Sequence, residues 1–376
     1  FVPVDPQFPC DAAEFIARLL RKRPSDRPPT AEDVVHQLAA LEENRRVALD
    51  ERGATRSADE GDRLELIGPE PGVRDAAVEE GDRLLDVGGD QVLVGVLGDA
   101  HGPHPVGEGD ERVGVGVGDA LTDALAAAVR PGVTKLVWIE TPANPTWSVT
   151  DIAAAADIAH RAGALLGVDS TVATPVLTRP IEFGADIVMH SATKYLNGHS
   201  DLIAGALIGA RDDAHWTKLR TIRAQLGTIL GQTEAWLLMR GMRTLFPRVD
   251  WACRSAQSLA ERLTAHPMVT EVLYPGLPSF AGHAVSRKQM KGGFGGMLSV
   301  RIKGGERAAI ATAARVALWK RATSLGGVES LIEHRASIEG PGTPCPPDLL
   351  RLSVGVEDSG DLFDDLDQAL RRADNA

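Results

Sequence analysis

The protein has 376 residues, of which 43% are hydrophobic and 24% charged, a globular composition with room for two or three domains. No uninterrupted apolar run approaches the roughly 20 residues of a membrane helix, and a net charge of -12 disfavours nucleic acid as a partner. Three distant cysteines, Cys10, Cys253 and Cys345, supply neither a disulfide framework nor a metal-binding pair, which favours a reducing, cytoplasmic location.

Residues 1–45 are predicted to form a helical segment. Apolar residues recur at helical spacing on both sides of Pro24, and Thr30 can cap the second helix. The string LLRKRPSDRPPTAEDVV resembles the closing segment of a protein-kinase catalytic lobe, in which Arg27 would form a structural ion pair. No kinase glycine-rich loop, H-R-D or D-F-G string follows it. The segment is therefore either a kinase-tail remnant or a generic helical hairpin.

Residues 46–118 form an acidic, glycine-rich segment. Residues 51–120 hold 17 Asp and Glu against 6 Arg, 15 of the 39 glycines and no aromatic residue. Few large side chains are present to offset the entropy cost of ordering. The string GVGVGD lacks the spacing of a phosphate-binding loop, because Asp119 stands where the third glycine belongs. We expect low order here; the alternative is that residues 92–96 pair as an edge strand.

Residues 119–247 alternate short apolar runs with helical patterns, as expected for an α/β domain with a parallel sheet. The predicted strands are residues 135–140, 164–169, 185–191 and 204–210, the last two lying side by side. Between the first two, Thr150 can cap a helix that ends at Gly163, which gives a β-α-β unit with a right-handed crossover. A mostly parallel sheet with helices on both faces is predicted.

Polar side chains follow these strands at their carboxyl ends, where open α/β sheets bind ligands. They are Asn144, Asp169, Ser191, Thr193 and Lys194. An amine, a carboxylate, an amide and two hydroxyls suit a cofactor with an aldehyde, a ring nitrogen and a phosphate, which is pyridoxal phosphate. His190, at the same strand end, is expected to be a packed, hydrogen-bonded histidine rather than an acid–base group.

Seven strings from about residue 120 onward stand in the order of one enzyme family. They are KLVWIETPANPT, VDSTVATP, HSATKYLNGHSDLIAGALIG, VLYPGLPS, GFGGMLSV, SLGGVESLIEH and LLRLSVGVED. This part resembles the cystathionine γ-synthase and γ-lyase family, pyridoxal-phosphate enzymes of cysteine and methionine metabolism. The resemblance implies an aspartate aminotransferase-like α/β fold, an amino-acid substrate and a homo-oligomer such as a homotetramer. It also implies elimination or replacement at Cγ of sulfur-containing or O-activated amino acids.

The resemblance also assigns site residues. Lys194 would be the catalytic lysine, which forms a Schiff base with the cofactor. The other cofactor-binding residues would be Asp169 at the ring nitrogen, Ser191 and Thr193 at the phosphate, Thr171, and Asn144 near the ring hydroxyl. The substrate-binding residues would be Arg351, which clamps the carboxylate, together with Ser324 and Asn144.

Elementary chemistry supports three of these roles. A buried lysine amine loses its proton through desolvation and becomes nucleophilic, as Lys194 would have to be. Asp169 would keep the ring nitrogen protonated, which makes the ring an electron sink. Arg351 offers a planar fork that matches a carboxylate.

Residues 248–376 are predicted to form a smaller α/β substrate domain, and the substrate would lie between it and the cofactor domain so that Arg351 can reach the site. Two strings of the family, an S-S-G-M-A-type phosphate loop and a Tyr-Gly-Gly motif with a ring-stacking tyrosine, are absent from this sequence. The acidic segment stands in their place. The alternative to an active enzyme is therefore a catalytically inactive, fused or mis-framed remnant.

Overall fold

The computed structural model describes residues 91–95, 111–113, 119–340 and 345–373. One compact unit of the chain comprises Gly89–Leu219 together with Gly227–Ala376. The helices expected in residues 1–45 and most of the acidic segment lie outside the described residues. Both sheets described below belong to this unit.

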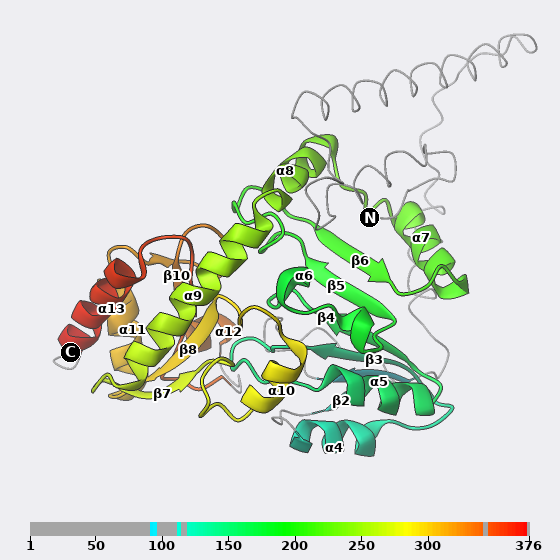
Figure 1. The fold of residues 1–376 in the computed structure, drawn as a ribbon, viewed down its shortest axis with the longest axis horizontal. Helices are drawn as coiled ribbons and strands as arrows, with labels where there is room; N and C mark the ends of the chain where they lie inside the picture. The colour runs from blue at the N-terminus through cyan, green and yellow to red at the C-terminus, as the bar shows by residue number, and fades with distance from the viewer. Residues whose placement is uncertain (1–90, 96–110, 114–118, 341–344, 374–376) are drawn as a thin grey trace, which may run out of the picture. The chain divides into compact units, whose positions relative to one another are not determined.

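The first sheet has six strands in the order β2-β1-β3-β4-β5-β6 (Figure 1). The strands are β1 (Gln91–Gly95), β2 (Glu111–Val113), β3 (Thr134–Glu140), β4 (Leu165–Asp169), β5 (Ile187–Ser191) and β6 (Gly205–Gly209). All neighbours are parallel except β5 and β6, which pair antiparallel. The predicted mostly parallel sheet and the predicted β5–β6 pairing are confirmed. Two pieces of the acidic segment join the sheet: β1 pairs with β3, and β2 pairs with β1 at the edge.

Helices accompany this sheet along the chain. They are α4 (Asp119–Ala128), α5 (Ile152–Arg161), α6 (Thr174–Leu177), the 3-10 helix η2 (Pro180–Phe183), α7 (Ala214–Leu226) and α8 (Gln232–Met242). Asp151 caps α5, and its carboxylate accepts a hydrogen bond from Ala154 N at 3.1 Å. The prediction of Thr150 as the cap is wrong by one residue, because Thr150 Oγ1 is buried and accepts no hydrogen bond from the described residues of the helix.

The second sheet has five strands in the order β7-β8-β11-β10-β9. The strands are β7 (Val269–Leu273), β8 (Met297–Ile302), β9 (Lys320–Arg321), β10 (Leu331–His334) and β11 (Leu349–Ser353). The helices of this part are α9 (Leu245–Thr264), α10 (His283–Gln289), α11 (Gly305–Arg315), α12 (Arg335–Glu339) and α13 (Ser359–Ala373). The long helix α9 packs against β7 and β8, and α11 packs against α13 (Figure 1).

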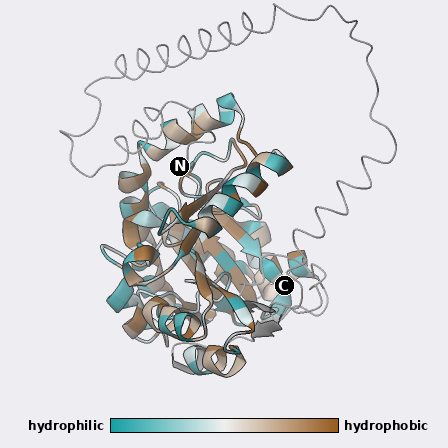
Figure 2. Cartoon of the chain, turned by 90° about the vertical axis from the view of Figure 1, so that its right-hand side faces the viewer, coloured by the Kyte–Doolittle hydropathy of each residue, from teal (hydrophilic) through white to brown (hydrophobic). Residues whose placement is uncertain are grey.

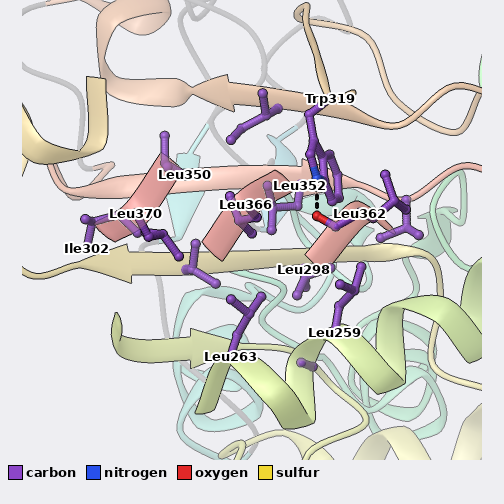
Figure 3. Close-up of a cluster of buried hydrophobic side chains, with 14 of the residues drawn as sticks. Leu259, Leu263, Leu298, Ile302, Trp319, Leu350, Leu352, Leu362, Leu366 and Leu370 are labelled. Carbon is purple, nitrogen blue, oxygen red and sulfur yellow. Dashed lines mark hydrogen bonds between the residues drawn. The ribbon is translucent and has the colours of Figure 1, made fainter. Parts of the chain in front are cut away.

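The core of the second sheet is a leucine-rich cluster between its strands and α9, α11 and α13. Figure 3 shows Leu259 and Leu263 of α9 pointing toward Leu298 of β8, and the leucines of α13 belong to the same buried cluster. Trp319 is buried there, and its indole Nε1 donates to the Leu362 carbonyl at 2.9 Å. Strands in the interior are largely brown in Figure 2, for hydrophobic residues, whereas several helices carry teal bands. Within the described ranges, no helix combines the length and apolar character needed to cross a membrane.

Near the predicted site, a buried tryptophan in the loop after β3 forms a hydrogen bond with a strand of the second sheet. Trp147, in the loop after β3, is fully buried, and its Nε1 donates to Ser299 Oγ on β8 at 2.9 Å. The Ser299 hydroxyl in turn donates to the Pro145 carbonyl at 2.7 Å. The loop that carries Asn144 is therefore fixed against the second sheet.

Candidate active site

The carboxyl ends of β4 and β5 are joined by a small polar network. Asp169 ends β4, and its Oδ1 accepts a hydrogen bond from Thr171 N at 2.9 Å. The Thr171 hydroxyl accepts from the amide of Ser191, which ends β5, at 2.8 Å. Because β4 and β5 are parallel neighbours, their last residues lie at one edge of the sheet, as predicted.

Thr193 and Lys194 follow β5 in a tight turn. Thr193 Oγ1 accepts from Ala204 N at 2.9 Å and donates to Ala204 O at 3.3 Å, so this hydroxyl is tied to the strand that follows. The Lys194 amide donates to Ser191 O at 3.1 Å, and the Lys194 carbonyl accepts from Gly198 N at 2.7 Å. The backbone around the lysine is thus held at both ends.

The buried side chain of Arg248, on α9, donates hydrogen bonds to backbone carbonyls of this turn and of α8. Its Nη1 donates to Tyr195 O at 2.9 Å and its Nη2 to Gly241 O at 2.9 Å. Gly198 has a φ of +74°, and a Cβ there would come within 2.0 Å of the Arg248 guanidinium. The turn therefore needs both a glycine in the left-handed region and a buried cation to bind its carbonyls.

The side chain of Lys194 points to the second sheet. Its Nζ donates to Ser324 Oγ at 3.4 Å. Burial lowers the pKa of the Lys194 amine, the positive charge of Arg351 lowers it further, and the charge of Glu333 opposes this. A lysine with a lowered pKa carries more of the neutral amine, which is the nucleophilic form.

Arg351 lies on β11 at the centre of a second polar network. Its Nη1 donates to Asn144 Oδ1 at 3.3 Å, and its Nη2 donates to the carbonyls of Thr323 at 2.6 Å and Ser324 at 3.1 Å. Its Nη2 also forms an ion pair with Glu333 at 2.6 Å. Burial lowers the pKa of Arg351 to about 10, and the charge of Glu333 counteracts that effect.

The predicted site residues are thus placed in two adjoining networks. Asp169, Thr171 and Ser191 form the first, and Lys194, Ser324, Arg351 and Asn144 form the second. Cross-strand pairing of Glu140 with Asp169 and a hydrogen bond from Asn144 N to Glu140 Oε1 at 3.3 Å connect the two. The Thr193 hydroxyl exchanges its hydrogen bonds with the Ala204 backbone and, among the described residues, with neither network.

Sequence reasoning missed two residues of this site. Glu333 contacts Arg351, and Arg248 supports the lysine turn. Both depend on strand register and helix packing between distant segments, and neither stands in a local pattern that marks it. His190 is buried as predicted, but its Nδ1 has no hydrogen-bond partner among the described residues.

Residues 114–371 match the family model described as Cys/Met metabolism PLP-dependent enzyme. The chain belongs to this family. It is 46% identical over 253 residues to cystathionine gamma-synthase of Mycobacterium tuberculosis strain H37Rv, and 43% identical over 256 residues to L-methionine gamma-lyase of Pseudomonas putida. Each match covers 66% of this chain and 64% of the relative, so the chain spans just under two thirds of these relatives.

Solved structures of family members share this fold. The metB crystal structure from Corynebacterium glutamicum matches with a TM-score of 0.71 and 40% identity, covering 79% of each chain. The apo structure of CalE6, a methionine gamma lyase from Micromonospora echinospora, matches with a TM-score of 0.67 and 35% identity, covering 78% of each chain. The recognition of the family from its seven strings is confirmed, as is the expected pyridoxal-phosphate-type α/β fold.

The donor set of the site fits pyridoxal phosphate, the cofactor of this family. The site contains a half-buried amine with a lowered pKa, a strand-end carboxylate and strand-end hydroxyls, which are the groups that such a cofactor requires. The chain has two tyrosines, and both are buried in hydrophobic clusters, Tyr195 beside the lysine turn and Tyr274 under the second sheet. Neither is placed to stack on a ring at the strand ends.

Proposed function

We propose that this protein is a pyridoxal-phosphate-dependent enzyme of sulfur amino-acid metabolism that eliminates or replaces the group on Cγ of its substrate. The substrate class is a sulfur-containing or O-activated amino acid with a free α-carboxylate. The observation that carries the proposal is the meeting of the Lys194 amine with Ser324 and Arg351, in a chain of this family.

Each residue has a separate task in this proposal. Lys194 binds the cofactor aldehyde and, as the only amine of the two networks, moves protons between neighbouring substrate carbons. Asp169 holds the ring nitrogen in its protonated form. Ser191 and Thr193 hold the phosphate, with Thr171 orienting both Asp169 and Ser191.

The substrate carboxylate is assigned to Arg351, with Ser324 and Asn144 beside it. The cofactor supplies an electron sink that stabilises negative charge on the substrate carbon next to the amino group. Within the second network, the side chains of Arg351 and Asn144 are buried, whereas Lys194 and Ser324 are half-buried. These contacts argue against the alternative of an inactive remnant.

The proposal extends to the setting of the enzyme. We infer a homo-oligomer in the cytoplasm, because the chain belongs to a family of metabolic enzymes and because closed symmetric assembly is the common outcome for such enzymes. Light scattering of the purified protein tests the first part, and a monomer of 39.9 kDa would refute it.

A product assay tests the activity. Cofactor-loaded protein is incubated with L-methionine, and separately with an O-acylated homoserine plus L-cysteine. Formation of 2-oxobutanoate reports elimination, and formation of a thioether reports replacement. Lys194→Ala should abolish both, whereas Lys303→Ala, which removes an exposed lysine beyond β8, should have no effect. Wild-type protein that forms neither product above the Lys194→Ala background would overturn the proposal.

A further inference from the structure

Glu333 and Arg351 face each other across two strands of the second sheet. β10 and β11 pair antiparallel in a register that places Glu333 directly opposite Arg351. Residues opposite each other in such a pair extend to the same face of the sheet. Both side chains are buried, with exposures of 4% and 3%, and the ion pair between them measures 2.6 Å.

This ion pair occupies the part of Arg351 that a substrate would need. A guanidinium can grip a carboxylate with two parallel N–H bonds, either end-on through Nη1 and Nη2 or side-on through Nε and Nη2. Both grips use an Nη2 hydrogen. Nη2 already contacts Thr323 O and Glu333 Oε2, each at 2.6 Å, and Ser324 O at 3.1 Å. A two-bond grip on a substrate therefore requires one of these partners to leave.

Glu333 is the partner that can leave. The Thr323 carbonyl belongs to the backbone, whereas Glu333 is a side chain with a second cation at hand. Arg335 Nη1 lies 3.4 Å from Glu333 Oε2, and Glu333 Oε1 is buried with no hydrogen-bond partner. Rotation of the carboxylate toward Arg335 would give Oε1 a donor and would leave no buried charge unpaired.

The pairing of charges in the cluster supports the same exchange. Arg335 pairs with both Glu333 and Glu339, and with Arg351 the four side chains are neutral in sum. A substrate carboxylate adds a third negative group to this cluster, and without any shift of Glu333 the two carboxylates would share the Arg351 guanidinium. With Glu333 moved to Arg335, Arg351 has one carboxylate partner again, and that partner is the substrate.

We propose that Glu333 sets the affinity for the substrate carboxylate by competing with it for Arg351, and that Arg335 receives Glu333 when the substrate binds. This inference rests on the proposed function, because it concerns the same carboxylate site. It makes Glu333 and Arg335 specificity-determining residues for ligands with a free carboxylate.

The test uses a ligand pair that differs only at the carboxylate. The acid is 4-(methylthio)butanoate, the methionine skeleton without its amino group, which cannot react, and the control is its amide. Dissociation constants for both are measured by calorimetry on cofactor-loaded wild-type protein and on variants. Glu333→Gln should bind the acid at least fivefold more tightly and the amide unchanged. Arg335→Gln should bind the acid at least fivefold more weakly, because Glu333 then stays on Arg351.

Glu357→Gln is the matched control. It removes another carboxylate beside β10, one that accepts hydrogen bonds from Ser330, and both affinities should equal those of the wild type. Arg351→Lys should reduce the preference for the acid over the amide. The opposite signs expected for Glu333→Gln and Arg335→Gln keep the test valid if one variant does not fold.

Two outcomes would overturn the inference. One is acid binding by Glu333→Gln that is equal to or weaker than wild type, while Arg351→Lys loses the preference for the acid. The other is the same change in affinity for acid and amide. Failure of the proposed function shows separately, as absence of product from L-methionine in the wild type, because the binding measurement requires no turnover.

Discussion

His190 should make the protein sensitive to mild acid. It lies on β5 with 5% of its surface exposed, and burial lowers its pKa from 6.5 to about 4, an effect that a hydrogen bond with the Ser170 backbone only partly offsets. Between these two pH values the unfolded chain binds a proton that the folded chain does not, so stability falls as the pH falls. At about 1.4 kcal/mol per pH unit, the full window corresponds to about 3 kcal/mol of unfolding free energy.

The variant His190→Gln isolates this effect, because glutamine keeps a nitrogen donor near the Nε2 position and does not titrate. Urea unfolding of wild type and variant is followed at intervals from pH 7 to pH 4. Carboxyl groups with lowered pKa values, such as Asp186 and Asp151, destabilise both proteins in acid and cancel in the comparison. As the pH falls through this window, the unfolding free energy of the variant should rise relative to that of the wild type by up to about 3 kcal/mol. Parallel loss of stability by the two proteins would refute the reasoning.

Three further substitutions test other parts of the site. After borohydride reduction, mass spectrometry should find the cofactor on the Lys194 peptide of the wild type and nowhere in Lys194→Ala; a label on another lysine would contradict the assignment. Arg248→Met should lower the unfolding free energy by about 3 kcal/mol, because it leaves buried carbonyls of the lysine turn without donors; an unchanged thermal midpoint would count against this. Trp147→Phe should lower the unfolding free energy by about 2 kcal/mol, because the hydrogen bond to Ser299 is lost and the ring is smaller. Wild-type stability of this variant in calorimetry would contradict that prediction.

Local sequence patterns predicted the strands that carry the site but not the contacts between distant segments. Asp169 and Ser191 stand at strand ends because apolar runs precede them, and parallel pairing then brings them together. The sequence predicts Thr150 as the helix cap, whereas the cap is Asp151. Both residue types cap helices, and only the geometry of the loop shows which of the two does so here. Glu333 was missed because its role follows from its register with Arg351, which no spacing along the chain encodes.

The division of the site between two sheets has a consequence for protein engineering. The groups assigned to the cofactor come from the first sheet, whereas Ser324 and Arg351 belong to a continuous stretch from Lys320 to Ser353 of the second sheet. A chimera that replaces this stretch with the corresponding one of a relative would exchange Ser324, Glu333 and Arg351 together, while Asn144 is retained from the host chain. Its cofactor chemistry should be inherited from the host chain, so that ligand preference and reaction type could be varied independently.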